Sequence, residues 1–399
     1  MKLSLILFAS AAFLGGHACA RPLQVFILAG QSNMQGHAKI GTFEHIGMDP
    51  DTKPLLAEMT GPDGKPKVCE RVWISSIGCA GDDTTEQTGR LTAGFGATKD
   101  KIGPEFTFGL TMEKLTDAPI LLIKTSWGGK SLNTDFRPPG AGPYVFNETQ
   151  LAQIQRQGAD IAKIKADKDA ATGVYYRLMI GHVGKVLADL NRVVPGYDAA
   201  EGYELAGFAW LQGWNDMVDN GTYPNRDKPG GYHAYSTALA DFIRDVRKDL
   251  NTPKLPFVIG VMGVGGPTAE YGPGEQRYKA THQNFRDAMA APAELPEFKG
   301  NVVALRTEKY WDRELKLARG KENEVKEQAK KLATEQKLKP DEERSLVERM
   351  RSESLTRREQ LILEKGVSNF EFHYLGSAKI LGGIGKGLAE AMADLVGRK

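Results

Sequence analysis

The sequence predicts an α/β protein, a three-layer α/β/α sandwich built around a parallel sheet. Short apolar runs are the first observation, and runs of this kind are typical of strands buried on both faces. Segments with helical periodicity separate the runs, and this alternation predicts parallel strands joined by helices. The runs lie at residues 25–29, 119–124, 204–211 and 257–261.

The intervening segments carry helix signals of ordinary strength. Pro104 and Glu105 suit the first turn of a helix. The last helix is rich in glycine, which would allow very close packing against the sheet despite the cost in helix propensity. An irregular stretch at 35–101, with one strand expected at 71–77, is long enough to shape a site. Helices are expected at residues 103–115, 175–190, 233–250 and 375–395.

Residues 1–20 have the pattern of a secretion signal. Lys2 gives a positive start, residues 3–14 form an apolar stretch too short to span a bilayer comfortably, and residues 18–20 are a small-x-small cleavage site. We therefore expect the mature protein to begin at Arg21 and to be exported, either to a periplasm or out of the cell.

The composition is that of an ordinary globular protein, with 41% hydrophobic residues, 26% charged residues and a net charge of +2. So small a charge gives no electrostatic case for nucleic acid or an anionic membrane as a partner. Cys69 and Cys79 remain once the signal is removed, and their spacing fits either a local disulfide or two buried thiols. Two cysteines alone do not make a convincing metal site, so we expect no zinc. We also expect no other metal and no cofactor.

Residues 21–399 are long enough for one large domain, which a segment of different character interrupts at 306–365. This segment is rich in Lys, Glu and Arg, and the four-three spacing of its apolar residues predicts an amphipathic helix. Pro340 then predicts a second helix that turns back. We expect a charged helical hairpin inserted in the domain, dispensable for folding, whose protein partner, if it has one, the sequence does not identify.

Small and polar residues follow three of the expected strands. Ser32 comes two residues after Gly30, and it is either a nucleophile or the N-cap of the next helix. Its surroundings, Gly-x-Ser-x-Met, differ from the Gly-x-Ser-x-Gly elbow of the α/β-hydrolases. Gly128 and Gly129 follow the second strand, where a tight turn and an oxyanion hole are both consistent with them. Gln212 follows the third strand and offers an amide donor.

His373 precedes the last helix and lies in an expected loop, which makes it the best placed histidine for a general base. Because the carboxyl ends of parallel strands lie on one side of a sheet, the groups after the strands can converge there. Together with His373 they supply a hydroxyl nucleophile, oxyanion donors and an imidazole base.

With these residues assembled, the sequence resembles the SGNH hydrolases, and more narrowly the branch of sialate O-acetylesterases and carbohydrate esterase family 6. The resemblance is carried by Gly30-Gln31-Ser32-Asn33-Met34, Ser126-Trp127-Gly128-Gly129, Gln212-Gly213-x-x-Asp216 and His373-Tyr374. It implies an SGNH/flavodoxin-like fold and metal-independent hydrolysis of acyl esters, typically acetyl groups on sugars. It also implies Ser32 as nucleophile, His373 as base, and an oxyanion hole of the Ser32 N–H, the Gly129 N–H (less surely that of Gly128) and Gln212.

Two positions depart from the family pattern. The family usually places an acid three residues before the histidine, where this chain has Phe370, and relatives often carry Glu where this chain has Trp214. The group that orients His373 is then Glu371, a backbone carbonyl within 368–371, or Asp216. We expect the backbone carbonyl, because an offset of two residues turns Glu371 to the other side of an extended segment.

The sequence therefore predicts an exported carbohydrate acetylesterase acting on an acylated sugar. Two alternatives stay open. One is a non-catalytic carbohydrate-binding or scaffold protein on the same fold, which the missing acid favours. The other is a hydrolase of lipid esters or thioesters, because a fold by itself does not fix the substrate.

Overall fold

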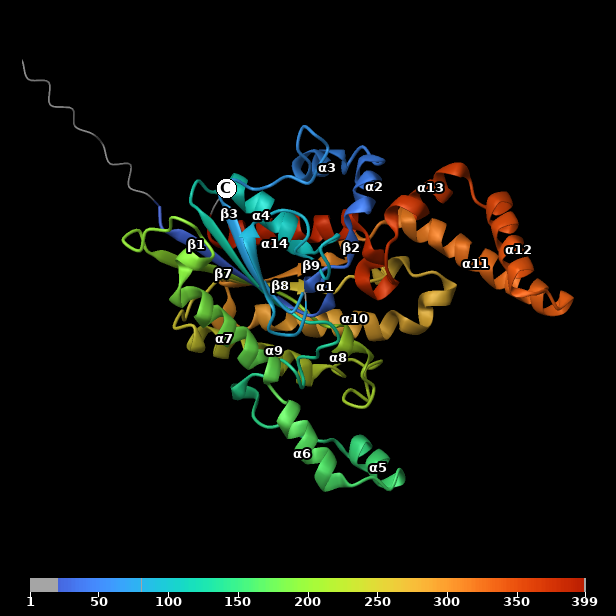
Figure 1. Cartoon of the computed structure of the whole chain (residues 1–399). Helices are drawn as coiled ribbons and strands as arrows, with labels where there is room; N and C mark the ends of the chain where they lie inside the picture. Colours follow the sequence, from blue (N-terminus) through green and yellow to red (C-terminus); the bar gives the residue numbers. More distant parts are fainter. Residues whose placement is uncertain (1–20, 80, 398–399) are drawn as a thin grey trace, which may run out of the picture.

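A seven-stranded sheet forms the centre of the protein (Figure 1). A computed structural model describes residues 21–79 and 81–397, so the predicted secretion signal at 1–20 lies outside the described residues. The strand order is β4-β3-β6-β1-β7-β8-β9, and every pairing is parallel except that of β4 with β3. The strands are β1 (Leu23–Gly30), β3 (Val72–Ile77), β4 (Glu86–Arg90), β6 (Ile120–Ser126), β7 (Tyr203–Leu211), β8 (Phe257–Val261) and β9 (Val302–Arg306).

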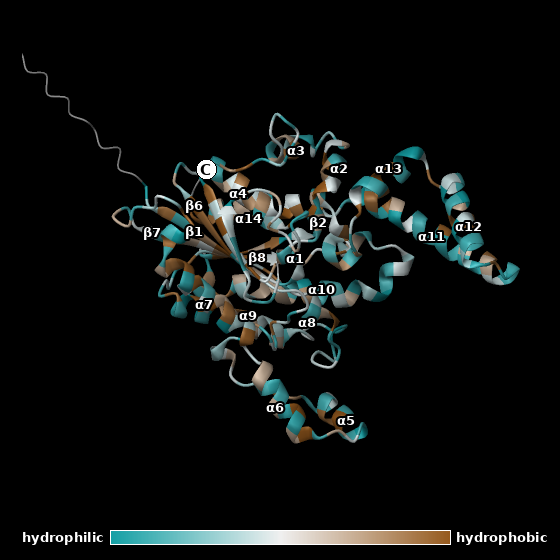
Figure 2. Ribbon diagram, viewed as in Figure 1, coloured by the Kyte–Doolittle hydropathy of each residue, from teal (hydrophilic) through white to brown (hydrophobic). Residues whose placement is uncertain are grey.

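Helices cover both faces of this sheet, which confirms the predicted three-layer α/β/α class. One face is covered by α4 (Pro104–Leu115) and α14 (Ala378–Leu395). The other is covered by α7 (Val174–Ala188), α9 (His233–Asp249) and α10 (Gln276–Ala290). Figure 2 shows hydrophobic residues gathered along the central strands, such as β1 and β6, and all eight residues of β1 are buried.

The glycines of α14 serve a different contact from the one expected. They bring α14 close to α4 rather than to the sheet alone: a Cβ on Gly385 would lie 2.2 Å from the Pro104 carbonyl oxygen. At the same contact the Thr107 hydroxyl donates a hydrogen bond of 2.8 Å to the Gly382 carbonyl. A side chain at Gly385 would push the two helices apart, so this glycine sets their spacing, whereas Gly383 and Gly387 lie against Tyr310.

The remaining elements are short and lie mainly in the stretch expected to be irregular and in the connections. Cys69 and Cys79 are both buried and free, so the disulfide alternative is wrong. No described helix has the length and apolar character needed to cross a membrane. The short elements are α1 (Ser32–Gln35), β2 (Ala38–Lys39), α2 (Phe43–Gly47), α3 (Lys53–Met59), β5 (Lys101–Ile102), α5 (Glu148–Arg156), α6 (Ile161–Ala171) and α8 (Trp214–Val218).

The charged insertion contains three helices where the sequence predicted two. They are α11 (Arg313–Gln336), α12 (Pro340–Ser354) and α13 (Arg357–Gly366). Arg306, the expected start of the insertion, is the last residue of β9. The α11–α12 hairpin projects from the body, whereas α13 returns to it and packs against α2 (Figure 1).

The root of the insertion belongs to the protein core. Leu315, Ile362 and Leu363 are at most 5% exposed and join the main hydrophobic cluster. Farther out, Glu322 replaces an apolar residue of the seam and is only 8% exposed at its side chain. Its carboxylate pairs with Arg319, Lys326 and Arg351, which gives the buried charge three partners.

We expect only the tip of the hairpin to be dispensable. Replacing residues 328–348 with a short Gly/Ser linker removes no member of the main cluster, so the melting temperature should change by no more than a few degrees, as for other changes below about 1 kcal/mol. Deleting 313–366 should unfold the protein, because it removes Leu315, Ile362 and Leu363 from the core. Thermal unfolding followed by circular dichroism compares the two deletions, and equal loss of stability in both would contradict this division.

Candidate active site

Strands β6, β1 and β7 are neighbours, and their carboxyl ends bring three of the predicted residues to one edge of the sheet. A Cβ on Gly30 would lie 2.1 Å from the Leu211 carbonyl oxygen, so only glycine allows the end of β1 to approach β7 this closely. The Gln31 N–H donates to the same carbonyl at 3.3 Å. The chain then turns directly into α1, the four-residue helix that carries Ser32.

Ser32 is the first residue of α1, and Gln31 occupies the N-cap position, so the N-cap alternative for Ser32 is wrong. Its side chain is buried, and the Gln31 amide nitrogen lies 3.5 Å from the hydroxyl oxygen. The turn after β6 lies against it, since a Cβ on Gly128 would be 4.0 Å from the Ser32 Cβ. Gly129 has a φ of +73°, a conformation that favours glycine, and it is exposed.

Gln212 lies at the same edge but is already engaged with other protein groups. Its amide nitrogen is 2.6 Å from an Asp216 carboxylate oxygen, 3.1 Å from the Lys130 carbonyl and 3.3 Å from the Gln31 side-chain oxygen. Its own side-chain oxygen accepts from the Tyr235 hydroxyl at 3.1 Å. An oxyanion would therefore have to compete with these acceptors for the amide hydrogens.

Asp216 binds groups in the loops after β6 and β7, and it does not orient His373. Its carboxylate accepts from the backbone N–H groups of Leu132 and Asn133 and lies 3.2 Å from the Tyr223 hydroxyl. Burial raises the pKa of Asp216 to about 6. The contacts tie the loop after β6 to the loop after β7, which holds Lys130 and Gln212 in place.

The group that orients His373 is the side chain of Asn369. His373 Nδ1 lies 2.9 Å from Asn369 Oδ1. The backbone N–H of Phe370 donates to the same oxygen at 2.7 Å, and because an amide N–H can only donate, the oxygen must lie on this side of the amide. The expectation of a backbone carbonyl is therefore wrong, and Glu371 is exposed on the wall of a separate cavity beside α11.

This contact fixes the tautomer of His373. Nδ1 must carry the hydrogen that Asn369 Oδ1 accepts, so Nε2 of the neutral ring is left with a lone pair. A lone pair at Nε2 is what a general base needs. An amide oxygen thus holds the ring in the form that the usual carboxylate would select, without supplying a negative charge.

A second histidine, His37, lies flat against the first. The two ring centroids are 4.0 Å apart and the planes differ by 1°. The Asn369 amide nitrogen is 3.5 Å from His37 Nδ1, so the amide bridges the two rings. Burial, followed by the charge of Lys101, lowers the pKa of His373 to about 4, and burial together with His373 lowers that of His37 to about 3. Both rings are neutral near pH 7.

His37 and α1 connect His373 to the region around Ser32. His37 follows α1 by two residues, and α1 packs against the turn that carries His373, residues Glu371–Gly376. The four residues of α1 span roughly 6 Å at about 1.5 Å per residue. Among the hydrogen bonds of the described residues there is none between Ser32 and His373, so their pairing stays a prediction.

The turn that carries His373 has a strained backbone, and the buried Tyr374 hydroxyl anchors it to the protein core. Tyr374 and Leu375 have φ values of +52° and +60°, in the left-handed region that costs a side-chain-bearing residue free energy. The Tyr374 hydroxyl is buried, accepts from the Gly263 N–H at 2.9 Å and lies 3.0 Å from the Thr307 hydroxyl. A buried phenol held at two points keeps the turn in this conformation.

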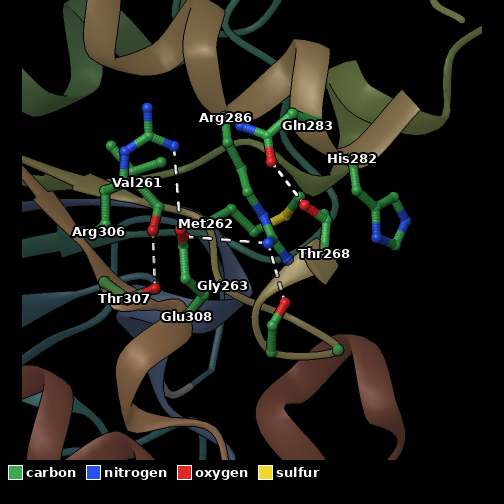
Figure 3. A network of polar contacts seen from close by, with 12 residues as sticks. Val261, Met262, Gly263, Thr268, His282, Gln283, Arg286, Arg306, Thr307 and Glu308 are labelled. Atoms are coloured by element: carbon green, nitrogen blue, oxygen red, sulfur yellow. Dashed lines mark hydrogen bonds and ion pairs between the residues drawn. The ribbon is translucent and has the colours of Figure 1, made fainter. Parts of the chain in front are cut away.

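Thr307 and Gly263, the two partners of the Tyr374 hydroxyl, belong to a wider polar network (Figure 3). The Thr307 hydroxyl donates to the Val261 carbonyl at 2.7 Å, at the end of β8. Arg286, which is fully buried, donates to the carbonyls of Val264 and Gly266 and so holds the loop that contains Gly263. The position of His373 therefore depends on a network that lies outside the predicted site.

A buried ion pair lies beneath α1. Lys124 of β6 and Glu105 of α4 are both completely buried, with 2.7 Å between Nζ and Oε2. Lys124 also donates to the carbonyls of Gln35 and Phe95, each at 2.7 Å. Because Gln35 is the last residue of α1, the ammonium group holds the carboxyl end of the helix that carries Ser32.

Comparison with known proteins decides the family. The model of a family described as "Carbohydrate esterase, sialic acid-specific acetylesterase" matches residues 22–166 and 184–329. The chain belongs to this family. It is thus a carbohydrate esterase, that is, a carboxylic ester hydrolase. The match includes Ser32, Gly129 and Gln212, and it ends before His373.

Solved structures similar to this carbohydrate esterase are distant in sequence. A protein from Arabidopsis thaliana is 17% identical over 72% of this chain and 86% of its own, with a TM-score of 0.39. A carbohydrate acetylesterase from Xanthomonas citri is 14% identical over 70% of this chain and 49% of its own, with a TM-score of 0.37. NanS is 14% identical over 72% and 78%, with a TM-score of 0.37. No curated protein matches the chain.

Two residues of the site, His37 and Asn369, were not predicted from the sequence of this carbohydrate esterase. Each lies close in sequence to a predicted residue, His37 five positions after Ser32 and Asn369 four positions before His373. Neither belongs to the motifs that carry the resemblance. One indication was present in the sequence: the expected loop before His373 contains a second polar side chain, Asn369.

We expect the Lys124–Glu105 pair to be essential to stability. Lys124→Met leaves Glu105 buried without a counter-charge and should cost about 3–5 kcal/mol of unfolding free energy. Lys124→Met combined with Glu105→Met should recover part of this loss, because no lone charge remains. The exposed pair Lys163–Asp167 is the matched control, and Lys163→Met should cost less than about 1 kcal/mol.

Urea unfolding of the four proteins measures these differences. A double variant as unstable as Lys124→Met alone would show that the lost hydrogen bonds to Gln35 and Phe95, and not the lone carboxylate, dominate the cost.

Proposed function

We propose that this carbohydrate esterase is exported and removes acetyl groups from its sugar substrate, with Ser32 as nucleophile and His373 as general base. The observation that carries the proposal is the orientation of His373: Asn369 leaves the Nε2 lone pair free on a ring that lies beside the helix of Ser32. The secretion signal predicted at 1–20 supports export.

The first half of the reaction forms an acyl-enzyme. Ser32 Oγ attacks the carbonyl carbon of the ester while its proton passes to His373 Nε2. The N–H groups of Ser32 and Gly129 face the oxyanion, and the Gln212 amide assists if it gives up one of its protein acceptors. The tetrahedral intermediate then collapses, the bond to the sugar oxygen breaks, and His373 returns the proton to that oxygen.

The second half regenerates the enzyme. Water attacks the acetyl carbon on Ser32 while one of its protons passes to His373 Nε2. The bond to Ser32 Oγ then breaks, the proton returns from His373 to Oγ, and acetic acid leaves and loses its own proton to solvent. The same two side chains therefore serve both steps. No metal ion or other cofactor is needed for proton transfer in this scheme.

Asn369 replaces the usual acid with a neutral acceptor, which has two consequences. It selects the productive tautomer, as a carboxylate would. It stabilises the imidazolium less than a carboxylate would, so the barrier is higher, but the neutral base persists to lower pH. A modest esterase that still works under acidic conditions fits this arrangement.

Substitution of the two catalytic residues tests the proposal. Ser32→Ala and His373→Ala should each lower kcat on a chromogenic acetyl ester by about a thousandfold or more, because each removes a group that makes or breaks bonds. Glu371→Gln should keep most of the activity. Unchanged melting temperatures would show that the variants fold.

Wild-type protein without esterase activity on any acetylated sugar would instead favour a non-catalytic carbohydrate-binding protein. Activity that survives Ser32→Ala would place the nucleophile elsewhere.

The role of Asn369 is tested by its pH profile. The base must be neutral to accept a proton, and a folded pKa of about 4 means that kcat/KM should fall only as the pH drops through about 4. Asn369→Asp should raise the His373 pKa and move this limb to higher pH, since a carboxylate favours the imidazolium. Asn369→Leu should lower kcat about a hundredfold, because the tautomer is no longer fixed.

These profiles are measured as kcat/KM from about pH 3 to about pH 8, where kcat/KM reports the free enzyme. If kcat/KM of the wild type falls near the ordinary pKa of histidine, the assigned role of Asn369 is wrong. It is also wrong if Asn369→Asp leaves the pH of this fall unchanged.

A further inference from the structure

Three aromatic side chains form a continuous strip beside His373. The rings of Trp214 and Phe372 are 5.7 Å apart between centroids, and those of Phe372 and Phe370 are stacked at 5.3 Å. Phe372 also meets the His373 ring edge-on at 4.4 Å. Phe370 is 68% exposed, so the far end of the strip is open to solvent.

The strip unites the two positions at which the sequence departs from the family pattern. Phe370 stands where the family usually has an acid, and Trp214 where relatives often have Glu. These residues are far apart in the chain, yet Phe372 joins them into one surface. Scattered exposed apolar residues are normal on a protein surface. Three aromatic rings in contact, one of them against a candidate base, indicate a binding surface.

The chemistry of the reaction says which part of a substrate would lie there. The oxyanion donors face the carbonyl oxygen of the ester. The base that first takes the serine proton must later give it to the leaving alcohol oxygen, so it lies on the alcohol side of the ester. The strip adjoins the base through Phe372 and therefore lies on the alcohol side too.

We propose that Trp214, Phe372 and Phe370 form the site that binds the sugar ring, by packing against the apolar C–H face of a pyranose that carries the acetyl ester. The inference rests on the proposed function and names the part of the substrate that the strip recognises. Aromatic side chains combine a large contact area with a fixed geometry, which suits them to a flat ring. Few hydrogen bonds are needed for such a contact, so the loss of the acid and of Glu is compatible with it.

Two esters that share an acetyl group but differ in the alcohol separate this role from catalysis: a methyl pyranoside with one O-acetyl group, and ethyl acetate. Phe370→Ala should lower kcat/KM on the acetylated pyranoside roughly tenfold, mainly through KM, as expected for one lost apolar contact. The loss on ethyl acetate should stay below about threefold. Trp214→Ala should act in the same direction, and Phe370→Tyr should retain activity.

Tyr203→Ala is the matched control. Tyr203 is an aromatic residue, 44% exposed, at the start of β7 and thus at the opposite edge of the sheet. Tyr203→Ala should leave kcat/KM unchanged on both the acetylated pyranoside and ethyl acetate. A control that falls as far as Phe370→Ala would show that the loss has no local cause.

Binding without catalysis keeps the two proposals distinguishable. Saturation-transfer NMR of the Ser32→Ala protein with the deacetylated methyl pyranoside should show transfer to the C–H protons of one ring face, and Phe370→Ala should weaken it. This result stands even if Ser32 is not the nucleophile.

Equal losses on both esters would overturn the inference, because the strip would then act only by positioning His373. A larger loss on ethyl benzoate than on the acetylated pyranoside would also overturn it, by assigning the strip to the acyl side. Activity that survives Ser32→Ala, with the NMR result intact, would contradict the catalytic proposal alone.

Discussion

The buried pair of Lys124 and Glu105 is the constraint on which the site depends. Removing two charges from water is costly, and the cost is offset only where geometry and additional hydrogen bonds are good. Here the ammonium group meets the Glu105 carboxylate and two backbone carbonyls, and the carboxylate also accepts from the Gly103 N–H. These partners come from β6, α4, the end of α1 and the loop before β5. A pair that joins four segments in this way selects one arrangement of the chain under Ser32, which packing of apolar side chains alone would specify less strictly.

A second constraint acts on His373, the proposed base. His373 lies in a turn whose left-handed residues Tyr374 and Leu375 are unfavourable, and the buried Tyr374 hydroxyl keeps the turn in place through Gly263 and Thr307. The ring itself is held by a neutral amide and a neutral imidazole, not by a carboxylate. Neutral partners do not attract an imidazolium, and burial with Lys101 nearby disfavours it further. These surroundings therefore stabilise a protonated His373 less than a carboxylate would, and they keep the ring neutral to lower pH.

Sequence reasoning found the parts of the molecule that depend on local patterns. Apolar runs located β1, β6, β7 and β8 because a strand buried on both faces must be apolar throughout. Parallel order then placed Ser32, Gly129 and Gln212 at one edge.

The same reasoning failed where contacts between residues far apart in the chain determine the role of a side chain. Asn369 was passed over because the family pattern directs attention to position 370, and His37 because its stacking partner is more than 300 residues away. Glu322 looked like a break in the seam of α11, although arginines from two helices and Lys326 make it a buried charge with partners.

The turn at 369–376 orients His373 although the acid usual in the family is absent. An acid three residues before the histidine combines two roles: it selects the tautomer and it stabilises the charged ring. In this chain Asn369, one residue earlier, takes the first role, and its backbone-bound oxygen leaves no choice of orientation. The backbone of Phe370 still holds Asn369 and His373, but its side chain has no role toward the His373 ring and can turn outward and stack on Phe372. Once the second role is given up, a charge beside Phe372 would only weaken an apolar surface. The same turn thus orients His373 through Asn369 and contributes Phe370 and Phe372 to the aromatic strip, while Trp214 completes the strip from α8.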